Sequence, residues 1–298
     1  MKCLFAVFLA SLLGVPALNS LAQEPPTSKQ IFVWPDLAPG ETERTTGTQL
    51  PMRAVDKPPI IRIEKIRRPP MDVYPATKNP NGAAVLILPG GGFGRVVPNL
   101  EGSEAAEWLG GMGVTCFVLN YRTRLPNNAE EPGWKRPLQD AQRAMRWIRA
   151  NAEKWNLDRN QIGLLAFSAG GQVGAILITD ENASYEPIDK VDEQSFRPDF
   201  AMLVYPWNMY DKKMDKLMPV IKVTGNTPPS FIIHTHDDGS TSLGSVLLYA
   251  DMKRQKVPAE LHVYENGGHG YGTRDRPNSN IGSWTDRATD WLQRRLPH

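Results

Sequence analysis

Cysteine, net charge and long apolar segments are all scarce in this sequence of 298 residues. It contains 2 cysteines, and its 34 Lys and Arg nearly balance its 32 Asp and Glu, which leaves a formal net charge of +2. A hydrophobic content of 41% excludes a disordered chain. The absence of a basic excess argues against nucleic acid as a partner.

A single apolar stretch, residues 4–13, stands near the N-terminus. Lys2 precedes it, and small residues at Ser20 and Ala22 follow it, which is the pattern of a secretory signal peptide covering residues 1–22. No later run approaches the roughly 18 apolar residues that cross a bilayer. We therefore expect a secreted or periplasmic protein without a membrane span, whose mature chain covers residues 23–298.

Removal of that signal takes Cys3 away and leaves Cys116 as the sole cysteine, so an intramolecular disulfide is impossible. Cys116 lies in the apolar, strand-like run 114–119. This position predicts a buried, unreactive thiol rather than a nucleophile.

Apolar runs alternate with helical patterns along most of the chain. The residues from 23 to 80 are rich in Pro and charge and predict an irregular N-terminal segment with one strand at 60–66. The expected strands that follow are 84–88, 114–120, 162–167, 200–205, 231–235 and 261–264. The expected helices are 102–109, 137–155, 169–179, 243–255 and 284–296. Continuous apolar strands separated by helices predict a single α/β domain with a mostly parallel sheet covered on both faces.

A serine stands where one of these strands turns into a helix. Residues 162–171 (IGLLAFSAGG) place Ser168 between small neighbours. A serine at so sharp a turn is held in a strained backbone conformation that projects its hydroxyl beyond the sheet edge. The short pattern is weak by itself and needs this strand-to-helix context.

Three consecutive glycines follow the strand 84–88, in residues 89–94 (PGGGFG). Such a loop can turn backbone N–H groups toward the oxyanion that forms when a serine attacks an ester. A flexible turn or a phosphate cradle are the alternatives. The spacing matches neither a dinucleotide fingerprint nor a P-loop, so no nucleotide cofactor is expected.

Acidic and imidazole side chains follow the next two strands. Asp237 and Asp238 come after the strand 231–235, and His269 lies in a glycine-rich loop after the strand 261–264. Ligands of parallel sheets bind at the carboxyl ends of the strands, where all these residues are expected. The serine needs an imidazole to take its proton, and the imidazole needs a carboxylate to orient it. His269 is the favoured base, His236 is the alternative, and either aspartate can orient it.

His234 and His236 alternate along one strand and could chelate a metal together. No third cluster of ligands appears in the sequence, so we expect no metal site. These two histidines are interpreted as structural or as supports for the catalytic residues.

With these residues in place, the sequence resembles the α/β-hydrolase serine esterases of the acetyl-esterase, acetylxylan-esterase and feruloyl-esterase-like kind. The resemblance runs from residue 34 to the C-terminus. Its motifs are residues 88–93 (LPGGGF), 120–122 (NYR), 137–144 (PLQDAQRA), 167–171 (FSAGG) and 267–270 (GGHG).

The resemblance implies an α/β-hydrolase fold without a large cap domain, and it implies roles for single residues. Ser168 would be the nucleophile, His269 the base and Asp238 the orienting acid, with Asp237 as its neighbour. The oxyanion would be held by backbone N–H groups of Gly91, Gly92 and Ala169. The sequence departs from the family pattern at Ala166, where a glycine is usual, at Gln172, where a histidine is frequent, and at Gly239, where a proline is common.

These observations predict a serine esterase without a cofactor that acts on short acyl groups, with acetyl as the expected group, of a small ester or an acylated polysaccharide. A non-catalytic binding protein of the same fold, and a lipase, peptidase or lactonase, are the alternatives. Trp34, Trp134 and Trp207 are expected in loops, where they could stack on a sugar ring.

Overall fold

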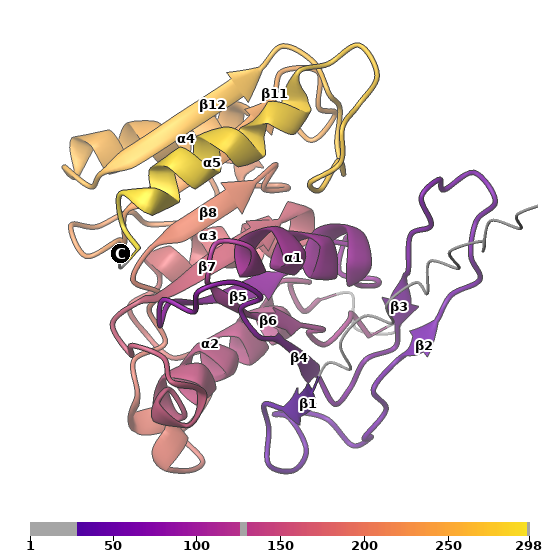
Figure 1. Ribbon diagram of the computed structural model, residues 1–298, viewed down its shortest axis with the longest axis vertical. Helices are drawn as coiled ribbons and strands as arrows, with labels where there is room; N and C mark the ends of the chain where they lie inside the picture. The colour runs from indigo at the N-terminus through magenta and orange to yellow at the C-terminus, as the bar shows by residue number, and fades with distance from the viewer. Residues whose placement is uncertain (1–28, 126–129, 297–298) are drawn as a thin grey trace, which may run out of the picture.

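The computed structural model describes residues 29–125 and 130–296, so the expected signal peptide lies outside the described part. Its centre is an eight-stranded sheet in the order β1-β4-β6-β5-β7-β8-β11-β12 (Figure 1). The strands are β1 (Lys29–Phe32), β4 (Pro70–Tyr74), β5 (Ala84–Leu88), β6 (Thr115–Leu119), β7 (Ile162–Phe167), β8 (Ala201–Val204), β11 (Ser230–Thr235) and β12 (Ala259–Tyr264).

β4 pairs antiparallel with both of its neighbours, β1 and β6. The pairs from β6 onward, through β5, β7, β8 and β11 to β12, are all parallel. Every residue of β5, β6, β7, β8 and β11 is buried, as continuous apolar strands require when helices cover both faces. The predicted α/β class with a mostly parallel sheet is confirmed.

Within residues 29–125 and 130–296, five α-helices cover the two faces of the sheet (Figure 1). They are α1 (Glu104–Gly110), α2 (Lys135–Ala150), α3 (Ser168–Thr179), α4 (Leu243–Arg254) and α5 (Trp284–Gln293). The apolar sides of α2, α3 and α4 belong to one core cluster, and those of α1 and α5 belong to a second cluster on the other face. Short helical turns lie at Asn99–Ser103, Glu153–Trp155, Lys190–Glu193 and Ile281–Ser283.

The N-terminal segment differs from the expectation. The predicted strand 60–66 is reduced to β3 (Ile63–Glu64), which pairs with β2 (Thr48–Gln49) outside the main sheet. Lys65 follows with a φ of 56°, a left-handed conformation that ends the strand. The main sheet instead recruits β4, whose short sequence becomes a strand through its pairing with β6.

The connections at the strand ends carry one other small ribbon, β9 (Tyr210–Asp211) with β10 (Lys216–Leu217), and no cap domain among the residues described. Cys116 is buried in β6, and burial raises the pKa of its thiol, in agreement with the expected unreactive side chain. No helix in the described ranges is long and apolar enough to span a membrane.

Candidate active site

Ser168 is held at a strained turn between β7 and α3. Its φ is 52°, in the left-handed region that L residues other than Asn and Asp rarely adopt. Small neighbours allow the turn to pack closely. A Cβ added to Gly170 would lie 2.3 Å from the carbonyl oxygen of Leu88, and one added to Gly90 would lie 2.6 Å from Cβ of Ser168. The glycines therefore let the serine turn approach the end of β5.

The departure at Ala166 is accommodated by a glycine in the second turn of α3. A Cβ added to Gly174 would lie 2.8 Å from Cβ of Ala166, so the missing side chain at Gly174 leaves the room that the methyl group occupies. The substitution of the usual glycine is therefore compensated inside the core. Gln172, the second departure, is buried and donates to the carbonyl oxygen of Asn208 at 2.9 Å.

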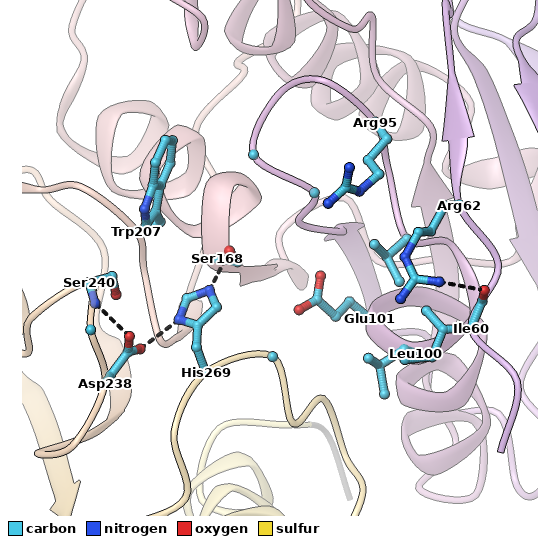
Figure 2. Close-up of a pocket in the computed structure, with 15 residues that line it drawn as sticks. Ile60, Arg62, Arg95, Leu100, Glu101, Ser168, Trp207, Asp238, Ser240 and His269 are labelled. Carbon is cyan, nitrogen blue, oxygen red and sulfur yellow. Dashed lines mark hydrogen bonds and ion pairs between the residues drawn. The ribbon is translucent and has the colours of Figure 1, made fainter. Parts of the chain in front are cut away.

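Three side chains from loops far apart in sequence form a hydrogen-bonded chain (Figure 2). Oγ of Ser168 lies 2.7 Å from Nε2 of His269, and Nδ1 of His269 lies 2.6 Å from Oδ2 of Asp238. His269 follows β12 and Asp238 follows β11, so all three residues stand beyond the carboxyl ends of their strands. The structure thus brings together the three residues expected from the sequence. The exposed His236 lies outside this chain.

The two neighbouring aspartates have separate surroundings. Asp238 is buried, and its Oδ1 accepts a hydrogen bond from the backbone N–H of Ser240 at 2.7 Å. Asp237 is exposed and accepts hydrogen bonds from the backbone N–H groups of Gly267 and Gly268 at 3.2 and 2.9 Å. The geometry therefore directs Asp238 at the imidazole and uses Asp237 to hold the loop that carries His269.

His234 also contacts the buried carboxylate of Asp238. Its Nε2 lies 3.1 Å from Oδ2 of Asp238, and its Nδ1 lies 2.8 Å from Oγ of Ser245. Burial opposes the ionisation of Asp238, but the hydrogen bonds from His234 and His269 outweigh it and lower the pKa of this carboxyl. The side chain is thus an ionised hydrogen-bond acceptor. Both nitrogens of His234 are engaged, and no cluster of three metal-ligating side chains occurs in the described residues.

The glycine loop after β5 lines the same cleft as Ser168. Gly91 and Gly92 have φ values of 134° and 65°, which turn the backbone toward the cleft. Their N–H groups donate to no residue that the structure describes. Ala169 is buried directly after Ser168, in the first turn of α3, where backbone N–H groups lack helical partners. Unpaired N–H groups at this position suit an anion.

A buried acid that the sequence did not reveal connects the glycine loop to the loop of His269. Glu101 accepts a hydrogen bond from the N–H of Gly90 at 2.7 Å and another from the hydroxyl of Tyr205 at 2.8 Å. The same hydroxyl accepts from the N–H of Gly272 at 2.8 Å, and the Tyr205 ring packs on His269. Burial raises the pKa of Glu101. No local pattern marks this residue, because its partners are distant in sequence.

The cleft has a volume of about 540 Å³. Besides the residues above, its wall contains Ile60, Arg62, Arg95, Val97, Leu100 and Trp207. Of the tryptophans expected near a substrate, Trp207 lines the cleft. The expectation for Trp34 is wrong, because its ring is buried and its Nε1–H donates to Asp140 at 2.8 Å.

Comparison with known proteins shows that the chain is similar to esterases. The BD-FAE family model matches residues 71–200, a range that contains Ser168 and the glycine loop. An acetylxylan esterase of Xylanibacter ruminicola is 27% identical over 70% of this chain and 46% of its own length. An endo-1,4-beta-xylanase B of Butyrivibrio fibrisolvens is 31% identical over 62% of this chain and 32% of its own length. The chain thus spans less than half the length of these two curated relatives.

A solved structure shares the fold over nearly the whole chain. The acetyl ester-xyloside bifunctional hydrolase from Caldicellulosiruptor lactoaceticus superposes with a TM-score of 0.69 at 28% identity. The match covers 89% of this chain and 96% of that one.

Proposed function

We propose that this chain, which is similar to α/β-hydrolase serine esterases, hydrolyses carboxylic esters through an acyl-enzyme on Ser168. The observation that carries the proposal is the hydrogen-bonded chain from Ser168 through His269 to Asp238. A serine hydroxyl becomes a nucleophile when an adjacent imidazole takes its proton. Nε2 of His269 is within that reach at 2.7 Å.

In the proposed reaction, Oγ of Ser168 attacks the ester carbonyl while Nε2 of His269 takes the hydroxyl proton. Asp238 accepts the Nδ1–H of His269, fixes the tautomer and stabilises the imidazolium. His269 returns the proton to the leaving alcohol, and a water activated by the same imidazole releases the acid. The strained φ of Ser168 presents its hydroxyl to the cleft throughout.

The negative charge that develops on the carbonyl oxygen is assigned to backbone donors. The N–H groups of Gly91, Gly92 and Ala169 are the proposed oxyanion hole, supported by the unpaired amides of the glycine loop beside Ser168. Glu101 anchors that loop through Gly90, and burial raises the pKa of its carboxyl.

The proposed substrates are short-chain acyl esters, with acetyl groups on a polysaccharide such as xylan as the specific case. Support comes from the acetylxylan esterase and the acetyl ester-xyloside hydrolase among the similar proteins. Export is part of the proposal and rests on the signal-like pattern of residues 1–22.

The test is the pre-steady-state release of nitrophenol from nitrophenyl acetate by wild type and by the Ser168→Ala variant. We expect a burst in the wild type that vanishes in the variant, with a loss of turnover of about 10⁴-fold or more. Ser195→Ala, which changes an exposed serine in a surface loop, is the matched control and keeps the burst. Acetate release from acetylated xylan then tests the polysaccharide substrate. A wild type that neither this ester nor a reactive phosphonate acylates would favour a non-catalytic binding protein.

A further inference from the structure

Two arginines line the cleft beside the glycine loop, and neither has a part in the reaction proposed above. Both guanidinium groups point into the cleft in Figure 2, on the side of Ser168 away from Asp238. Arg95 is half-buried, and Arg62 is buried. A cation inside a cleft loses hydration, so its presence there calls for a negatively charged partner.

A single backbone bridge holds the segments that carry these two side chains. Backbone N–H and C=O groups of Ile63 and Val96 pair in an antiparallel bridge, at 3.0 and 2.8 Å. Side chains alternate along paired strands, so Arg62 and Arg95, each one residue from the bridge, lie on the same face of it. Arg95 also packs against the glycine loop, since a Cβ added to Gly91 would lie 3.1 Å from its Cγ.

The charges of the two arginines are balanced unequally. Nη1 of Arg62 lies 2.6 Å from Oδ2 of Asp56, in a pair that is mostly shielded from solvent. Arg95 forms no hydrogen bond or ion pair within the described ranges. Glu64 lies opposite Arg95 in register, but its carboxylate is 3.4 Å from Nζ of Lys65. No described residue therefore compensates the positive charge at Arg95.

The acidic groups of the cleft do not supply the missing charge. Both carboxylate oxygens of Glu101 are occupied by Gly90 and Tyr205, and Asp238 is bound to its two histidines. A ligand anion is the remaining partner for Arg95. The guanidinium offers a planar fork of donors that fits carboxylate and sulfate groups.

We propose that Arg95, with Arg62 beside it, forms an anion subsite that selects esters whose alcohol part carries a carboxylate or a sulfate group. In saccharides this describes the acetyl ester of a uronic acid or of a sulfated sugar. An acetyl group is small and uncharged, so the charged group must belong to the alcohol part of the ester. The inference therefore rests on the proposed esterase function. Arg95 is thereby a specificity-determining residue close to the glycine loop.

The experiment compares kcat/KM on three monoacetylated sugars of one scaffold: methyl glucuronide, its uncharged methyl ester, and methyl glucoside sulfate. We expect the wild type to prefer a charged substrate, and the Arg95→Gln variant to lower the charged-to-neutral ratio about tenfold. Arg95→Lys should restore part of the preference. Which charged sugar shows the preference identifies the anion as carboxylate or sulfate.

The control is Arg254→Gln, which removes the same charge from an exposed arginine at the C-terminal end of α4, at the opposite end of that helix from the site loop. It should leave the ratio unchanged. Equal kcat/KM on charged and neutral sugars in the wild type, or an unchanged ratio in Arg95→Gln, would overturn the subsite while leaving the esterase function in place.

If none of the three esters is hydrolysed, the acetylated-sugar part of the proposed function fails, whereas the burst with nitrophenyl acetate still tests the esterase activity. The subsite is then tested by binding, with chemical-shift titration of methyl glucuronide and methyl glucoside sulfate against uncharged methyl glucoside. Binding of a charged sugar that Arg95→Gln weakens supports the subsite. Equal binding of charged and uncharged sugars overturns it.

Discussion

Replacing Asp238 by asparagine separates the roles of two adjacent acids. The change is nearly isosteric, and its effect follows from the hydrogen bonds at this position. Oδ1 of Asp238 accepts the Ser240 N–H at 2.7 Å, while Oδ2 faces Nδ1 of His269 at 2.6 Å and Nε2 of His234 at 3.1 Å. In Asp238→Asn, the amide oxygen stays on the Ser240 N–H, and the amide NH₂ group takes the place of Oδ2.

The NH₂ group then donates to the imidazole that it faces. Nδ1 of His269 must become an acceptor, so its proton moves to Nε2, and that nitrogen can no longer take the proton of Ser168. The substitution also removes the carboxylate that stabilises the imidazolium. We expect kcat to fall about 10⁴-fold, which corresponds to about 5 kcal/mol of lost transition-state stabilisation.

Asp237→Asn is the matched control, because it makes the same chemical change one residue earlier. Asp237 is exposed and only accepts hydrogen bonds from Gly267 and Gly268, one of which an amide oxygen retains. We expect its kcat to stay within about tenfold of wild type. Steady-state hydrolysis of an aryl acetate by both variants, with circular dichroism to verify folding, makes the comparison. An Asp238→Asn enzyme within tenfold of wild type, or an equal loss in Asp237→Asn, would refute this reasoning.

Two further predictions concern stability. Gly170→Ala places a methyl group 2.3 Å from the carbonyl oxygen of Leu88. Urea denaturation should therefore show a free energy of unfolding lower by about 1–3 kcal/mol, despite the better helix propensity of alanine. Gly239→Ala is the control: an added Cβ has no atom within 4 Å, so the free energy of unfolding should change by no more than about 0.5 kcal/mol. The lowered native pKa of Asp238 contributes stability above its unfolded pKa of about 4, and this contribution is lost as the pH falls below that value. The difference in unfolding free energy between wild type and Asp238→Asn should therefore shrink when denaturation is repeated from about pH 6 down to about pH 3; a difference independent of pH would contradict it.

Local sequence determined most of the sheet and the place of the serine. The runs 84–88, 162–167 and 231–235 are apolar throughout and became the buried strands β5, β7 and β11, because only a strand covered on both faces can bury every side chain. Ser168 was predictable because its turn is encoded by adjacent residues. His269 was predictable because it lies in a glycine-rich loop directly after a strand.

Other features depended on residues that meet only in the folded chain. The residue pattern left Asp237 and Asp238 open, and only the family resemblance favoured Asp238. Both follow β11, and the turn after Thr235 decides which carboxylate is buried. Strand β4 was missed because its five residues become a strand through pairing with β6, which is distant along the chain.

The surroundings of the site were decided by tertiary structure alone. Glu101 carries no local signal, and its partners Gly90 and Tyr205 are 11 and 104 positions away in sequence. Arg62 and Arg95 meet across a backbone bridge that joins two irregular segments. The sequence by itself determined which strands exist and where a nucleophile and a base follow them, because those patterns are short-range. The surroundings of the nucleophile and the base depend on packing between distant segments. Only the tertiary structure decided which aspartate is buried, that Glu101 is the buried acid, and that Arg62 and Arg95 line the cleft.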